Sequence, residues 1–127
     1  AIREEMQRSP EELKATNDPR WQAMLRGDHT WGDESSEEFH DRVVGAVEGL
    51  IEANPGRRIA VYCHGGVINV YLCHVFGLPP NHGLIYPNYT SIHRIAASRG
   101  GHRSVVTVNE TAHLRRTGLP MGLVQQP

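Results

Sequence analysis

A short apolar run that leads into a glycine turn constrains this chain more than any other feature. Ile59–Cys63 is an unbroken run of apolar and aromatic residues, which predicts a strand buried on both faces, as in a parallel sheet. His64-Gly65-Gly66 follows, and Val67–Phe76 is apolar almost all round until Gly77, as in a buried helix. The unit is a strand, a tight turn and a helix, and the predicted fold class is α/β.

Helix signals dominate the first half of the chain. Ser9-Pro10 and Asp18-Pro19 have the form of helix starts, each followed by helix-forming residues. Ser35 and Glu38 form a capping box, and the apolar face that follows continues to Ile51 before Asn54-Pro55-Gly56 ends it. The sequence therefore predicts two short helices and one long amphipathic helix before the apolar run.

The second half predicts a hairpin and a loose tail. Ser91–Ala97 and Arg103–Val108 are β-prone runs on either side of a turn that contains Gly100-Gly101. Leu119–Pro127 shows no periodicity and is expected to be a loose end. The hairpin can cover only one edge of the buried strand, so we expect upstream chain or a second subunit, in a homodimer, to cover the other edge.

Charge and composition exclude several classes of protein. Residues 1–54 carry 13 acidic and 6 basic side chains, whereas residues 55–127 carry 7 arginines and Glu110 alone. These arginines are scattered and lack interleaved aromatic residues, so no nucleic-acid partner is expected. The basic half fits either a pocket for a small anion or simple packing against the acidic half. With no apolar run of about 20 residues, no membrane partner is expected, and the location is expected to be cytoplasmic.

The histidine after the apolar run is the candidate for chemistry. Ligands of parallel α/β sheets bind beyond the carboxyl ends of strands, where a helix N-terminus offers free N–H groups to anions. His64 lies at this place, and Gly65 and Gly66 let a ligand approach the backbone. The alternative is that His64 caps the turn and that the glycines serve only the turn. Cys63 and Cys73 have no metal spacing and are expected to be reduced, buried thiols.

Several motifs, in order and at matching spacing, carry a family resemblance. They are Gly32–Ser35, Glu38–Val43, Ile59–Ile68, Gly77–Pro79, Asn88–Ile92 and Val108–Leu114. Over residues 32–114 the chain resembles the histidine phosphatase superfamily, the phosphoglycerate-mutase-like proteins. Gly-Gly-Val-Ile after His64 is closer to the broad-specificity phosphatase branch, although Asn69 stands where that branch often has an arginine.

The resemblance implies a three-layer α/β/α fold and a phosphohistidine intermediate. A histidine in an Arg-His-Gly motif on the first strand takes the phosphoryl group, and water removes it, without a metal or other cofactor. His64 matches the second histidine of the catalytic site, and Gly65 and Gly66 match the adjacent substrate contact. Asn88 is expected to border the substrate site together with Thr90, although both could be simple turn residues, and His113 is expected to be structural.

The reactive motif itself is missing. No Arg-His-Gly triplet occurs in the sequence, and the strand that should carry it is not recognisable. We therefore expect residues 1–127 to be the C-terminal, partial domain of a phosphomonoester hydrolase, inactive alone, with a variable helical insert over 1–31 and a loose tail over 115–127. The alternative is a shortened, non-catalytic module for anion binding or oligomerisation. The expected ligand is a phosphorylated small molecule or phosphate ion.

Overall fold

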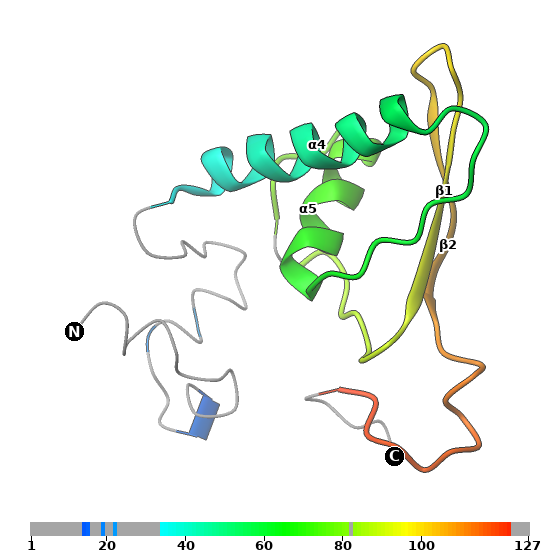
Figure 1. The fold of residues 1–127 in the computed structure, drawn as a ribbon. Coiled ribbons are helices and arrows are strands. Elements are labelled where there is room, and N and C mark those ends of the chain that lie inside the picture. Colours follow the sequence, from blue (N-terminus) through cyan, green and yellow to red (C-terminus); the bar gives the residue numbers. More distant parts are fainter. Residues whose placement is uncertain (1–13, 16–18, 20–21, 23–33, 82, 123–127) are drawn as a thin grey trace.

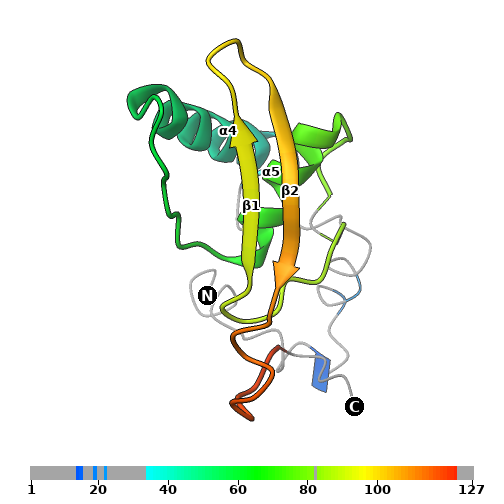
Figure 2. The same cartoon turned by 90° about the vertical axis from the view of Figure 1, so that its right-hand side faces the viewer.

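The computed structural model describes residues 14–15, 19, 22, 34–81 and 83–122. It contains the helices α4 (Ser36–Ala53) and α5 (Gly65–Phe76) and the strands β1 (Ile92–Ala97) and β2 (Arg103–Glu110). The two helices cross on one face of the β1–β2 hairpin, as Figures 1 and 2 show from two directions. Mixed helix and strand content agrees with the predicted α/β class, but the sheet formed by the described residues has two antiparallel strands.

Helix α4 begins and ends where the sequence predicts. The Ser35 Oγ accepts a hydrogen bond of 3.1 Å from the Glu38 N–H, so the predicted capping box is confirmed on its serine side. At the other end, Asn54 is the C-cap, and its side-chain Nδ2 donates to the Leu50 carbonyl at 2.8 Å. Phe39 and Val43 are buried from the apolar face. The caps therefore define a helix of 18 residues.

Helix α5 is the most buried element of the described structure. Residues 69–73 are buried, as the all-round apolar pattern predicts. Gly77 ends the helix in a left-handed conformation with φ of 71°, and the Leu78 N–H reaches back to the Cys73 carbonyl at 2.9 Å. Glycine tolerates this conformation without steric cost. The predicted glycine cap is confirmed, and the helix begins at Gly65, two positions before the apolar run.

The hairpin is confirmed as well. Strands β1 and β2 pair antiparallel, and irregularities in the register lie between Ile92 and Ile95. The turn between them is closed by the Ser98 N–H, which donates to the His102 carbonyl at 2.9 Å. Gly101 adopts φ of 91°, which explains a glycine at this corner.

A half-buried ion pair joins three of the four elements. Glu48 on α4 accepts hydrogen bonds from Arg103 Nη2 on β2 at 2.6 Å and from the Tyr71 hydroxyl on α5 at 2.8 Å. The Arg103 guanidinium lowers the pKa of the Glu48 carboxyl through this hydrogen bond. Burial, followed by the hydrogen bond to Glu48, raises the pKa of Tyr71 to about 12. Beside it, an apolar core of Phe39, Val43 and Val70 packs between the helices.

The segment before α5 differs from the prediction. Residues 57–64 form no strand with any described residue and run from the end of α4 to the start of α5 on the β1 side of the hairpin (Figure 2). Val61 is 50% exposed and Tyr62 is 96% exposed, so the run is not buried on both faces. Its backbone has no ladder partner among the described residues, and a strand without such a partner is not stable.

The cysteines are free, but only one is buried. Cys73 is fully buried in α5, and its Sγ lies 3.5 Å from the Asn81 carbonyl oxygen. Cys63 is exposed, which corrects the prediction of a buried thiol. The rest of the segment agrees with this, since all residues from 57 to 64 are exposed in the described structure.

The ends of the chain are described only in part. Lys14, Ala15, Pro19 and Gln22 have helical backbone, but the bounds of the two short helices predicted after Ser9 and Asp18 lie outside the described residues. In the tail, the Met121 carbonyl accepts a hydrogen bond of 2.7 Å from the Tyr89 N–H, a contact that the prediction of a loose end did not include. Residues 123–127 lie outside the described part. None of the described helices has the length and hydropathy of a membrane span.

Candidate active site

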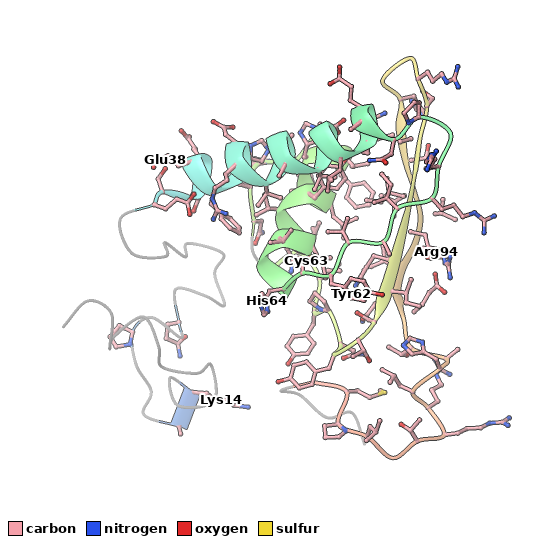
Figure 3. The ribbon with its side chains drawn as sticks, viewed as in Figure 1. Lys14, Glu38, Tyr62, Cys63, His64 and Arg94 are labelled. Atoms are coloured by element: carbon pink, nitrogen blue, oxygen red, sulfur yellow. The ribbon has the colours of Figure 1, made fainter. Side chains whose placement is uncertain are left out.

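His64 stands between the unpaired segment and α5. It is the N-cap residue of α5, with φ of −96° and ψ of 165°, and its carbonyl accepts hydrogen bonds from the Val67 and Ile68 N–H groups at 3.1 and 3.2 Å. The side chain is exposed and makes no capping hydrogen bond. Figure 3 shows it beside Cys63 at the start of α5. The imidazole is therefore free to meet a ligand, because it does not cap the helix.

Two backbone donors follow directly. The N–H groups of Gly65 and Gly66 are in the first helical turn, and neither has a backbone acceptor among the described residues. Helix α5 carries no acidic residue in this turn, so nothing on the helix itself offsets the partial positive charge of its N-terminus. An imidazole next to two free N–H groups is an arrangement that suits an anion.

The loop before β1 packs against this turn. A Cβ placed on Gly65 would lie 3.4 Å from Pro87 Cγ and 3.7 Å from Pro87 Cδ. These are ordinary van der Waals distances, so the Pro87 ring packs beside Gly65 but does not by itself require a glycine there. Pro87 is adjacent to Asn88, so the structure brings the loop of Asn88 to the start of α5.

In the described part of the structure, no hydrogen bond joins Asn88 to His64. The Asn88 N–H donates to Asn109 Oδ1 at 2.9 Å, and the Asn88 Oδ1 lies 3.4 Å from the position that a Cβ on Gly122 would take. Of the four candidate site residues, His64, Gly65 and Gly66 form one continuous group. Asn88 joins them through the contact of Pro87 with Gly65.

Thr90, the other residue expected to border the site, has an unusual backbone. Its φ is 53°, a left-handed conformation that is uncommon for a β-branched residue. The Thr90 carbonyl lies 2.8 Å from His113 Nε2, which is a structural contact of the kind expected for His113.

Asn69, which was not predicted to belong to the site, is a buried side chain that contacts both the start of α5 and the loop before β1. Asn69 on α5 is 2% exposed, and its Nδ2 lies 3.1 Å from both the Gly65 and the Ile85 carbonyl oxygens. Its Oδ1 accepts a hydrogen bond of 2.7 Å from the Ile85 N–H. The signal that could have found this residue is an amide within an otherwise apolar helix, because a buried amide must be hydrogen bonded.

The residues of this site lie within a recognised family match. The model of the histidine phosphatase superfamily (branch 1) matches residues 2–111, well over half of the 127-residue chain. This chain belongs to the histidine phosphatase superfamily. No curated protein and no solved structure matches the chain.

Superfamily membership confirms the resemblance at its broad level. The match starts well before Gly32, where the recognised motifs begin, and it includes His64, both glycines after it and Asn88. It marks the chain as a relative of phosphatases and mutases. Among the described residues, no three His, Cys, Asp or Glu side chains are grouped so that they could hold a metal ion.

Proposed function

We propose that this chain forms the phosphate-binding part of a phosphomonoester hydrolase, with His64 as a catalytic residue and Gly65 and Gly66 as substrate contacts. The observation that carries the proposal is the exposed His64 imidazole at the N-terminus of α5, beside two N–H groups without a described acceptor. Superfamily membership supports a phosphatase or a mutase-like enzyme. Asn88 would complete the edge of the site through its loop.

The proposed chemistry is transfer of the phosphoryl group in two steps. A histidine nitrogen attacks phosphorus, the bond from phosphorus to the ester oxygen breaks, and the leaving alcohol takes a proton from an acidic group that would also come from outside these 127 residues. Water then attacks phosphorus and gives a proton back to that group, the phosphorus–nitrogen bond breaks, and inorganic phosphate and the free histidine result. In both steps negative charge is spread over the phosphoryl oxygens, and the His64 ring N–H and the backbone donors of Gly65 and Gly66 would stabilise it.

The nucleophile would come from protein sequence outside these 127 residues. No Arg-His-Gly triplet is present here, and Ile59, Val61 and Tyr62 expose apolar surface next to the site. We propose that residues 59–63 pair with the strand that carries the nucleophile, within a three-layer α/β/α domain of which this chain is the C-terminal part. Gly-Gly-Val-Ile after His64 favours the broad-specificity branch, and the free thiols favour a cytoplasmic location.

One observation favours a second function. Because the sequence lacks the Arg-His-Gly motif, the chain could be a non-catalytic module that binds an anion or a second copy of itself. Both functions use the same anion site, so binding alone does not separate them. Formation of phosphohistidine does, because only the hydrolase needs a covalent intermediate.

A titration with inorganic phosphate tests the site in this chain. In ¹⁵N NMR spectra at constant ionic strength, the Gly65 and Gly66 amide signals are expected to shift with saturation, and His64→Ala is expected to weaken binding at least about tenfold. His102→Ala is the matched control, because His102 is an exposed histidine in the hairpin turn, remote in sequence from α5. Equal phosphate affinity in His64→Ala and the parent chain would remove His64 from the site.

A phosphatase assay tests whether the protein is an enzyme. We expect the 127-residue chain alone not to hydrolyse a small aryl phosphate. A longer form that includes an Arg-His-Gly segment is expected to hydrolyse it and to form labelled phosphohistidine, with a loss of several orders of magnitude in His64→Ala. A longer form that binds phosphate and never forms phosphohistidine would favour the non-catalytic module.

A further inference from the structure

The loop next to the candidate site is held by two asparagine side chains from distant parts of the chain. Asn69 on α5 binds both backbone groups of Ile85, its N–H at 2.7 Å and its carbonyl at 3.1 Å. Asn109 at the end of β2 binds the Tyr86 carbonyl at 3.0 Å and the Asn88 N–H at 2.9 Å. The two amides therefore satisfy four backbone groups within residues 85–88, which we call the clamped loop.

Asn69 also acts on the helix turn that carries the donors. Its Nδ2 donates to the Gly65 carbonyl at 3.1 Å. That carbonyl belongs to the same planar peptide unit as the Gly66 N–H, and in a trans peptide the two groups point in opposite directions. A second hydrogen bond to the Gly65 carbonyl, beside the backbone bond of the helix, therefore further restrains the direction of the Gly66 N–H.

Asn109 is held in an unusual backbone conformation of its own. Its φ is 58°, and its N–H donates to His93 Nδ1 at 3.1 Å. With Nδ1 as an acceptor, His93 is neutral and carries its proton on Nε2, which lies 2.9 Å from Ser91 Oγ. Burial lowers the pKa of His93, which agrees with a neutral ring. Asparagine tolerates this left-handed conformation, so the side chain faces the clamped loop at little cost.

We propose that Asn69 and Asn109 are positioning residues of the phosphate site: together they hold the clamped loop, through Pro87, against Gly65 and restrain the direction in which the Gly66 N–H points. This inference rests on the proposed function, because it assigns the two amides to the same site. The physical gain is preorganisation, since donors that are already fixed need no reordering when the anion binds. Neither amide touches the ligand.

The test uses Asn109→Gly, because glycine keeps the positive φ and removes only the side chain. Phosphate affinity, measured from the Gly65 and Gly66 amide shifts, is expected to fall about tenfold, and the nuclear Overhauser effect between Gly65 and Pro87 is expected to disappear. The amide signals of α4, and those of β1 and β2 away from His93 and Asn109, are expected to stay in place. Asn54→Ala is the matched control, since it removes a different asparagine that bonds to backbone, at the far end of α4.

A second variant provides a readout that general destabilisation does not give. Asn69→Leu replaces the buried amide with a side chain of similar size, and it is expected to weaken phosphate binding by about the same factor. Because both amides hold one loop, the double variant is expected to lose less affinity than the product of the two single losses. If Asn69→Leu does not fold, Asn109→Gly alone decides.

The outcomes separate the two proposals. Asn109→Gly with the affinity of the parent chain, while His64→Ala loses binding, would overturn the positioning role and leave the proposed function standing. A parent chain whose Gly65 and Gly66 signals do not respond to phosphate would overturn both. Tenfold weaker binding in Asn109→Gly, with unchanged binding in Asn54→Ala, supports the positioning role.

Discussion

The helix–hairpin body and the connecting segments of this protein are held together in different ways. In the body, formed by α4, α5, β1 and β2, apolar side chains are buried between helices and Glu48 joins three elements. In the connecting segment 57–64, the apolar side chains Ile59, Val61 and Tyr62 are exposed and the backbone has no ladder partner among the described residues. The body has a packed core, whereas the segment has exposed apolar side chains, and the candidate site lies where the segment meets α5.

The largest expected difference between the two regions is in hydrogen exchange. Amides at the centre of α5, such as Leu72, are expected to exchange at least about 10³ times more slowly than their intrinsic rate, because they open only with the body. The amides of residues 59–63 are expected to have protection close to none. Exchange measured by mass spectrometry or NMR would contradict this comparison if residues 59–63 were as protected as α5, and it would then show that the segment is paired.

Truncation of side chains sharpens the same comparison. Leu72→Ala, at a position that is 1% exposed, is expected to lower the free energy of unfolding by about 2–5 kcal/mol through lost burial and a cavity. Val61→Ala, at 50% exposure, is expected to change it by no more than about 0.5 kcal/mol. Urea unfolding followed by circular dichroism measures both. In a longer form with the partner strand, a much larger cost for Val61→Ala is expected.

Loss of the Glu48 carboxylate, which bonds to Arg103 and Tyr71, is expected to have a smaller effect on stability, and this effect depends on pH. Glu48→Gln is expected to cost about 1–3 kcal/mol at neutral pH, because the hydrogen bonds to Arg103 and Tyr71 lose a charged acceptor. The pKa of Glu48 is lowered in the folded state, mainly by its hydrogen bond with Arg103. Its contribution is therefore present above the unfolded value of about 4.3 and is lost as pH falls through the lowered folded pKa.

The control for this prediction is Glu52→Gln, an exposed position on the same helix. It is expected to change stability by less than about 0.5 kcal/mol. Thermal unfolding of the parent chain and both variants from neutral pH down to acid pH would measure the effect. If Glu48→Gln had the same stability as the parent chain at neutral pH, the hydrogen bonds of the Glu48 carboxylate would not stabilise the body.

The smallest expected effect is a gain in stability in the loop before β1. Thr90→Asn is expected to raise the free energy of unfolding by about 1 kcal/mol, because asparagine adopts the positive φ of this position more readily than a β-branched residue does. The hydrogen bond from His113 is kept, since it involves the Thr90 carbonyl. Thr90→Val keeps the branching and is expected to give no gain, so equal stabilities of the two variants would show that the backbone is unstrained.

The sequence predicted the body well because its boundaries are encoded locally. Ser35 caps the residues that follow it, Gly77 ends α5, and the glycine turn at 100–101 closes a hairpin between two adjacent runs. The strand prediction for Ile59–Cys63 failed in the described structure for the opposite reason. An apolar run shows that a segment can be buried, but the hydrogen-bonded partner that would make it a strand is not encoded in the segment.

Some residues of the candidate site could be predicted from the sequence, and others could not. His64, Gly65 and Gly66 follow one another in the chain, so a motif is enough to place them together. Asn69 and Asn109 were not predicted to support the site, because the loop residues that they bind lie 16 to 23 positions away in the sequence. A buried amide in an apolar helix indicates that a polar partner exists, but only the packed structure identifies it.

The clamped loop has a consequence for protein engineering. Both amides that shape residues 85–88 come from other elements, one from α5 and one from the end of β2. If the loop sequence alone were grafted into another scaffold, the loop would not keep its conformation, because the two amides that hold it would be absent. A transfer that includes the loop and both amides has to take in at least the continuous stretch from the start of α5 to the end of β2, residues 65–110.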